Sequence, residues 1–300
     1  MQLIGGDDMN DLVCYKTMPV WNKNSLPLMF QERHNTKEDT YAQLKVLKGS
    51  LDFIIFNEDG SEQHFTFDIH NQPPIIEPQV WHRISACSDD MECQLDFLCK
   101  SELKFYKEHG LTTPHSEVRY LCENHLSKPC KILDLGSGRG RNSFYLALQG
   151  YDVTSVDINP QHIQAIDFVK KQAGVENIHT AVYDINSHQI QEDYELIIST
   201  VVLMFLQREK IANVITNMQE HTLPGGVNVI VCAVETPDAP LDLVPFKCFL
   251  KPGELEGYYK DWDILKYNEN PGHLHRTDSQ GNRIKLNFAT LIAKKKQVRN

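Results

Sequence analysis

The segment at residues 131–143 constrains the fold of this chain more than any other. It begins with an apolar, β-type run, continues through alternating glycines at positions 136, 138 and 140, and leads into a helix-forming run at residues 144–148. The pattern predicts a strand, a glycine turn and a helix. Glycine permits backbone conformations with positive φ and a close approach of a ligand to the main chain, and a helix N-terminus offers free N–H groups. We therefore expect a ligand at this turn.

The residues around the glycines decide between two classes of cofactor. A dinucleotide site has the spacing G-x-G-x-x-G, in which the third glycine packs the helix against the strand. Here the spacing is G-x-G-x-G, and Arg141 stands where that third glycine would fall. Asp134, two residues before Gly136, would repel a pyrophosphate but could hold an ammonium group. The motif favours a ligand with an amino-acid end.

Acidic residues at the ends of the next two predicted strands fit the rest of such a ligand. The strand predicted at residues 151–156 leads to Asp157, which is well placed for a ribose diol. The strand predicted at residues 178–183 leads to Asp184, which could accept a hydrogen bond from an adenine amino group. A ligand with an amino acid, a ribose and an adenine is S-adenosyl-L-methionine, which becomes S-adenosyl-L-homocysteine after methyl transfer.

Strands and helices alternate beyond the glycine turn. Two further strands are predicted at residues 194–200 and 227–234, and two helices at residues 160–172, closed by Gly174, and 208–220. This rhythm predicts an α/β domain with a doubly wound parallel sheet, in which ligands bind beyond the carboxyl ends of the strands. Four residues would meet at that edge: Asp134, Asp157, Asp184 and Thr200.

These motifs identify a family. Residues from about 103 to 295 resemble a class I S-adenosyl-L-methionine-dependent methyltransferase, and the closer resemblance is to the bacterial tellurite-resistance methyltransferases of the TehB family. It rests on residues 138–143, 199–206, 258–262 and 274–286. The resemblance implies a seven-stranded Rossmann-like sheet and an enzyme that methylates tellurite, and selenium oxyanions, to volatile species. Ser137 departs from the cysteine that the family often has, a change that a residue offering mainly its backbone should tolerate.

The resemblance and the strand-end pattern together give the expected site. The cofactor contacts would be His115, Asp134, Gly136, Ser137, Gly138, Arg141, Asn142, Asp157, Ile158, Asp184, Ile185 and Thr200. The helix carrying His115 is predicted to begin with Thr113 as its cap and Pro114 at its first position. Arg141 would hold either the cofactor carboxylate or the substrate anion.

The expected catalytic residues, His275, Arg276 and Arg283, follow from the family motif. They lie where a hairpin would join the last two strands, predicted at residues 262–267 and 283–293. An arginine fork suits a multi-oxygen anion, and histidine can donate a hydrogen bond or manage a proton. Two other functions stay open: methyl transfer to a small thiol or other organic acceptor, and a non-catalytic sensor that binds cofactor and ligand.

An all-β domain is predicted at residues 8–99, ahead of the methyltransferase domain at residues 103–297. Short β-rich runs recur at 43–47, 51–56, 64–69, 74–76, 81–84 and 93–98. They predict a small antiparallel barrel or jelly roll, and they resemble the cupin-like domain found ahead of some tellurite methyltransferases. The H-x-H pair of metal-binding cupins is broken, because Thr36 follows His34. His34, Glu38 and His82 could form only an incomplete site, so we expect no metal and a role in docking, ligand sensing or homodimerisation.

Charge and composition limit the partners. The net charge is −10, and no Lys/Arg block is longer than residues 294–296, so the basic surface of a nucleic-acid binder is missing. The eight cysteines include no C-x-x-C pair, which favours reduced thiols. The most apolar run, residues 196–206, is about half the length that spans a bilayer. We expect a cytoplasmic protein with a small inorganic oxyanion as its substrate and neither a nucleic-acid nor a membrane partner.

Overall fold

The computed structural model describes residues 11–126, 130–237, 239 and 241–297, so residues 8–10 of the predicted first domain lie outside the described residues. The chain divides into two compact units, with the division between Thr112 and Thr113. The first unit ends with a 3₁₀ turn and the short helix α2 (Lys104–Glu108), in which Tyr106 is buried.

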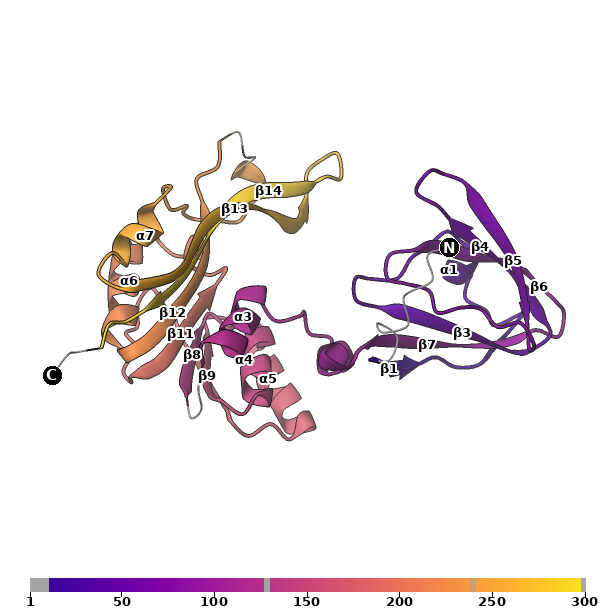
Figure 1. Cartoon of the computed structure of the whole chain (residues 1–300), viewed down its shortest axis with the longest axis horizontal. Helices are drawn as coiled ribbons and strands as arrows, with labels where there is room; N and C mark the ends of the chain where they lie inside the picture. Colours follow the sequence, from indigo (N-terminus) through magenta and orange to yellow (C-terminus); the bar gives the residue numbers. More distant parts are fainter. Residues whose placement is uncertain (1–10, 127–129, 238, 240, 298–300) are drawn as a thin grey trace. The chain divides into compact units, whose positions relative to one another are not determined.

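The first unit consists of two antiparallel sheets (Figure 1). In one, β7 (Glu92–Lys100) pairs with β1 (Leu12–Thr17), β2 (Trp21–Asn22) and β3 (Tyr41–Lys48). In the other, β4 (Ser50–Phe56) lies between β5 (Glu62–Asp68) and β6 (Trp81–Cys87). The helix α1 (Leu28–Gln31) lies between β2 and β3 in the sequence. Alternate side chains of both sheets, such as those of Val46, Leu51 and Cys93, share one buried core. The predicted all-β architecture is confirmed.

Two features of the first unit differ from the prediction. Residues 74–76 form no strand, and only Ile76 makes an isolated bridge, to Ala42. Two prolines, Pro73 and Pro74, explain this because proline has no N–H to donate to a ladder. The strands β1 and β2 were not predicted.

The histidines considered as metal ligands pack against each other. His34 and His82 exchange backbone hydrogen bonds of 3.0 and 2.8 Å, and their ring centroids are 4.3 Å apart. The His82 ring also stacks on Phe53. Burial lowers the pKa of His82 to about 4. Glu38 offers its backbone carbonyl to Lys107, and within the described residues no group of three or more histidine, cysteine or acidic side chains is arranged to hold a metal.

The second unit is built on a seven-stranded sheet in the order β10-β9-β8-β11-β12-β14-β13. The strands are β8 (Lys131–Leu135), β9 (Asp152–Asp157), β10 (Ile178–Val182), β11 (Tyr194–Thr200), β12 (Thr222–Val234), β13 (Asp263–Thr277) and β14 (Arg283–Lys294). The first five are parallel, and β14 runs antiparallel to both of its neighbours. This order is the class I methyltransferase fold predicted from the sequence.

Helices cover both faces of this sheet. Figure 1 shows α3 (Ser116–Asn124), α4 (Arg141–Leu148) and α5 (Pro160–Ala173) on one side and α6 (Ile211–Glu220) and α7 (Glu254–Tyr258) on the other. Leu133, Ile197 and Ile215 belong to the core beneath α6. Helix α5 matches the prediction and closes at Gly174, whose φ is 66°. Across the described parts of the chain, we find no helix with both the length and the apolar character needed to cross a membrane.

Three element boundaries in this unit correct the predictions. Helix α3 begins at Ser116 with His115 as its cap, not at Thr113–Pro114, because the His115 ring nitrogen accepts the Glu117 N–H. Residues 208–210, predicted as helix, form a 3₁₀ turn before α6. The β13–β14 ladder continues to the pair Thr277–Arg283, so the predicted hairpin residues lie within paired strands.

Candidate active site

The glycine turn after β8 uses each of its three glycines differently. Gly136, Gly138 and Gly140 have φ of 80°, 56° and 85°, in the left-handed region that favours glycine. A Cβ at Gly136 would lie 2.5 Å from a Val202 methyl carbon, and one at Gly140 would lie 2.9 Å from Ile166. A Cβ at Gly138 would meet no atom within 4 Å. Gly138 is therefore the glycine whose backbone a ligand can approach.

Asp134 lies in β8 immediately before this turn and is fully buried, with 1% of its surface exposed. The Ser143 hydroxyl, from the first turn of α4, donates to the Asp134 carboxylate at 2.6 Å. Burial raises the pKa of Asp134 to about 6, although the Ser143 hydrogen bond and the Arg141 charge act to lower it. The Ser143 backbone N–H also bonds to this carboxylate and acts to lower its pKa.

Asp157, at the end of β9, holds the turn in place. Its carboxylate accepts hydrogen bonds from the backbone N–H groups of Gly138 and Asn159, both at 2.8 Å. The His162 ring nitrogen lies 3.1 Å from the same carboxylate. Sequence analysis did not select His162, although its position in the first turn of α5, five residues after Asp157, was a usable signal. A ribose diol would share this carboxylate with three protein donors.

Asn142 joins two elements of the site. Its side-chain oxygen accepts the His115 backbone N–H, and its side-chain nitrogen donates to the Thr200 hydroxyl, both at 2.9 Å. Asn142 is only 3% exposed. Both halves of its amide are therefore bound by the protein, and it connects the start of α3 to the end of β11.

His115 is neutral at physiological pH. Burial lowers its pKa to about 4, and the positive charge of Arg141 lowers it further. Because its Nδ1 accepts the Glu117 N–H at 3.3 Å, the ring proton is on Nε2, which can donate. Glu117 also pairs with Lys266 of β13 at 2.7 Å, an unpredicted ion pair that ties α3 to the sheet.

The residues after β9 and β10 differ in what they can offer. The Ile158 side chain is 61% exposed. The Ile185 side chain is instead buried in the core on the α6 side. Asp184 accepts from the Asn186 backbone N–H at 2.9 Å and from the Ser187 hydroxyl at 3.1 Å. The Asn186 hydrogen bond lowers the Asp184 pKa, so this carboxylate is ionised.

Val201, directly after Thr200, has an unusual backbone. Its φ of 61° is in the left-handed region, which a β-branched residue rarely adopts, and its N–H donates to the Val231 carbonyl at 2.7 Å. Such strain costs about 1–3 kcal/mol and clusters at functional sites. No local pattern in the sequence predicts it.

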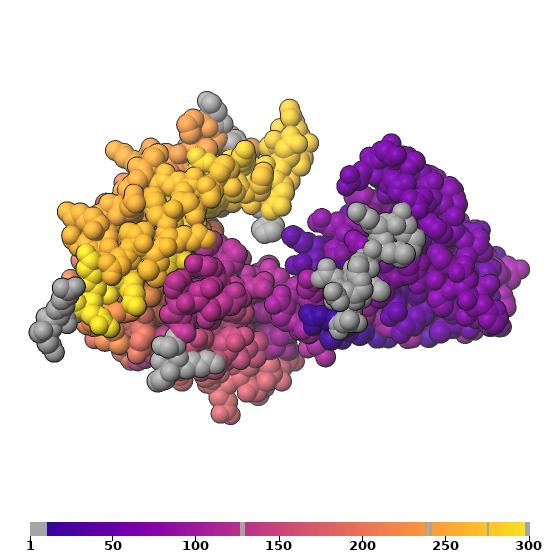
Figure 2. All heavy atoms as spheres, in the orientation of Figure 1, coloured from indigo at the N-terminus to yellow at the C-terminus, as the bar shows by residue number. Residues whose placement is uncertain are grey.

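The predicted catalytic residues lie near the tip of the β13–β14 hairpin. Figure 1 shows this hairpin extending past the end of the sheet, and Figure 2 shows it in yellow as a projection of the second unit. The Arg283 guanidinium donates to the Leu274 carbonyl at 2.9 Å across the ladder. Arg276 is exposed, and the His275 side chain lies outside the described residues. Within the described residues, no hydrogen bond or ion pair joins Arg276 or Arg283 to the glycine turn.

Family comparisons agree with this architecture. The family described as "Tellurite resistance protein TehB" matches residues 97–292, and the "TehB-like domain" matches residues 16–95. The chain belongs to the TehB family of S-adenosyl-L-methionine-dependent methyltransferases. The family, the enzyme class and the cofactor predicted from the sequence are thereby confirmed.

Individual relatives cover nearly the whole TehB-family chain. It is 52% identical over 290 residues to the "Probable S-adenosyl-L-methionine-dependent methyltransferase TehB" of Haemophilus influenzae strain 10810, covering 96% of this chain and 99% of the relative. The crystal structure of TehB from Haemophilus influenzae matches with a TM-score of 0.71 and 50% identity, covering 96% of this chain and 99% of that one. The chain is also 44% identical over 220 residues to "Hemagglutinin 1" of Eikenella corrodens, covering 73% of this chain and 71% of that protein.

Proposed function

We propose that this enzyme transfers a methyl group from S-adenosyl-L-methionine to tellurite, with selenium oxyanions as further substrates, and thereby gives tellurite resistance. The observation that carries the proposal is the TehB family match over residues 97–292, which spans both the glycine turn and the hairpin. The carboxylates of Asp134 and Asp157, on either side of the open Gly138, supply polar contacts suited to the cofactor.

Four residues of the cofactor site then have a defined task. The ionised carboxylate of Asp134 would accept the cofactor ammonium group, Asp157 the ribose hydroxyls and Asp184 the adenine amino group. Ile158 would contact the adenine through its exposed side chain. When bound, the cofactor supplies a methyl group on a sulfonium, which is a good leaving group. The remaining task of the protein is to position the nucleophile and exclude water.

The hairpin cations would hold the substrate. Arg276 and Arg283 would bind the oxygens of the oxyanion, since guanidinium groups match multi-oxygen anions in geometry and charge. Held in this way, the tellurium lone pair would face the methyl carbon opposite the sulfonium, and methyl transfer would leave the cofactor as a neutral thioether. His275 would donate a hydrogen bond to a substrate oxygen.

The test is methyl transfer from labelled S-adenosyl-L-methionine to tellurite and to selenite. We expect label in a tellurium-containing product with the full chain, and its loss in His275→Ala, Arg276→Ala and Arg283→Ala while cofactor binding persists. Lys294→Ala, an exposed cation at the far end of β14, is the control and should retain activity. If the full chain binds cofactor but methylates neither oxyanion, the substrate assignment is wrong, and small thiols and other organic acceptors become the next substrates to assay. Failure with those acceptors as well would point to a sensor.

A further inference from the structure

The connection between β10 and β11 leaves a cavity on the α6 side of the sheet. Crossovers between parallel strands usually contain a helix, but residues 183–193 form only turns and irregular backbone. This connection and α6 border a cavity of about 200 Å³ that is partly open to solvent. Leu135, directly before the glycine turn, lines this cavity, but no residue given a task in the proposed reaction does.

The lining of this cavity has apolar residues at its base and a lysine on its rim, and polar atoms make up most of its accessible surface. Its apolar residues are Leu135, Ile185, Ile190 and Val214, and Lys210, Asn213 and Asn217 line its α6 side. His188 adds an imidazole, and no acidic residue lines the cavity. The absence of acidic residues is notable because the chain as a whole carries a net charge of −10. The site favours an anion over a cation.

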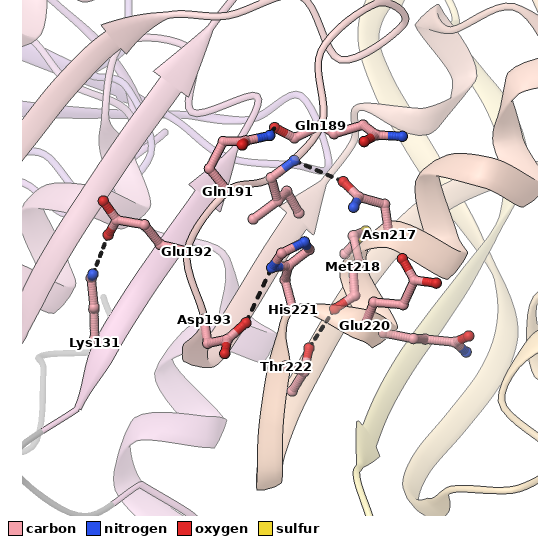
Figure 3. Close-up of polar contacts among 12 residues, drawn as sticks. Lys131, Gln189, Gln191, Glu192, Asp193, Asn217, Met218, Glu220, His221 and Thr222 are labelled. Atoms are coloured by element: carbon pink, nitrogen blue, oxygen red, sulfur yellow. Dashed lines mark hydrogen bonds and ion pairs between the residues drawn. The ribbon is translucent and has the colours of Figure 1, made fainter.

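Two donors of the rim are unused. Across the part of the chain that the structure describes, neither the Lys210 ammonium group nor the Asn213 amide makes a hydrogen bond or ion pair, whereas the Asn217 amide oxygen accepts the Ile190 N–H at 2.8 Å. Figure 3 shows Asn217 in this role. The Tyr183 hydroxyl stays protonated because burial raises its pKa to about 12.

The far end of the connection is fixed to the sheet. Glu192 pairs with Lys131, and Asp193 lies 3.1 Å from the His221 ring nitrogen, as Figure 3 shows. Together with the Asn217 hydrogen bond, these contacts hold the cavity wall in position before any ligand arrives. A preformed wall lowers the entropic cost of binding.

We infer that this cavity binds a small organic acid, whose carboxylate meets Lys210 and Asn213 and whose compact apolar body packs on Leu135 and Val214. A cavity of about 150 Å³ holds benzene, so by volume an acid the size of benzoate fits this one. An inorganic oxyanion would leave the apolar base uncovered.

The ligand would also act on the cofactor site, an effect that rests on the proposed function of Asp184. Asn186 lines the cavity and donates to the Asp184 carboxylate through its backbone N–H at 2.9 Å and its side chain at 3.1 Å. The Asn186 side-chain oxygen accepts the Gln207 N–H at 3.1 Å. A ligand that shifts Asn186 therefore changes the affinity for the adenine end, and the cofactor changes the affinity for the ligand by the same factor.

The experiment is calorimetric titration of the full chain with benzoate, without cofactor, beside two probes that each lack one feature. Benzamide keeps the ring but lacks the charge, and inorganic phosphate keeps a charge but lacks the apolar body. We expect benzoate to bind, and both other probes to bind at least about tenfold more weakly. No binding of benzoate, or equal binding of benzamide or phosphate, would overturn the assigned ligand class.

A pair of variants tests the location. Lys210→Gln should weaken benzoate binding about tenfold, and Lys171→Gln, an exposed lysine of α5, should leave it unchanged. Equal binding to both variants would overturn the site. Cofactor titrations with and without saturating benzoate test the coupling, and identical affinities would refute it. Because these titrations need no methyl transfer, they stay informative if tellurite is not the substrate.

Discussion

The Ser143 hydroxyl donates a 2.6 Å hydrogen bond to the carboxylate of Asp134, and both residues are buried. This bond connects the first turn of α4 to β8 across the glycine turn. It is the nearest polar support for a carboxylate whose pKa burial raises to about 6. The charge of Asp134 at neutral pH therefore depends in part on one hydroxyl group.

The pH dependence of cofactor binding follows from this pair. The cofactor ammonium group needs ionised Asp134, so affinity should fall as the pH drops through about 6. Ser143→Ala removes a hydrogen bond to the charged form and should move this midpoint upward by about one pH unit. Calorimetric titration with S-adenosyl-L-methionine from about pH 5 to about pH 8, a range that spans this pKa, measures the midpoint for the unchanged protein and for Ser143→Ala. An unchanged midpoint in Ser143→Ala would show that the hydroxyl does not support the charge.

The variant Asp134→Asn should be more stable and bind cofactor more weakly. Because the folded-state pKa is raised from 3.8 to about 6, the stability that the protonated carboxyl contributes is present below pH 3.8 and lost as the pH rises through about 6. Asparagine imitates the protonated form, so at pH 7 the free energy of unfolding should rise by up to about 3 kcal/mol. Urea unfolding of the variant and of the unchanged protein measures this difference in the free energy of unfolding. Asp261→Asn, at an exposed carboxylate, should change little, and a destabilised Asp134→Asn would contradict the argument.

The three glycines of the turn should separate folding from binding. Gly138→Ala places a methyl group in open space, so it should cost only about 1 kcal/mol of stability for its left-handed backbone while lowering cofactor affinity about tenfold or more. In Gly136→Ala the new methyl group would clash with Val202, so overpacking should lower the free energy of unfolding by a further ~1–3 kcal/mol. Thermal unfolding and cofactor titration of both variants give the comparison. Equal stability losses would argue against this division of roles.

His162 should support the cofactor site through Asp157. Removing its ring in His162→Ala takes one donor from the carboxylate, and we expect a cofactor affinity about threefold to tenfold lower with little change in stability. His179→Ala removes a similar histidine–aspartate pair, with Asp152, away from the glycine turn and should leave affinity unchanged. Parallel loss in both variants would mean that the effect is not specific to Asp157.

Several parts of the molecule followed directly from local patterns. Helix α5 begins at Pro160 and closes at Gly174, as predicted. The structure adds an Asn159 cap, and both ends are predictable because caps act within one turn of the chain. The start of α3 was misplaced because a histidine ring, rather than the preceding Thr113, caps it. That choice depends on Asn142, which binds the His115 backbone from 27 residues away.

The sequence by itself determined the alternation of strands and helices, the glycine turn, the acidic strand ends and the family. Each of these depends on residues that are close together in the chain. Only the tertiary structure decided that Val201 is strained and that the helix-free β10–β11 connection borders a cavity against α6. These features come from packing between segments far apart in sequence, where burial and long-range hydrogen bonds override local preference. Local patterns cannot encode such contacts.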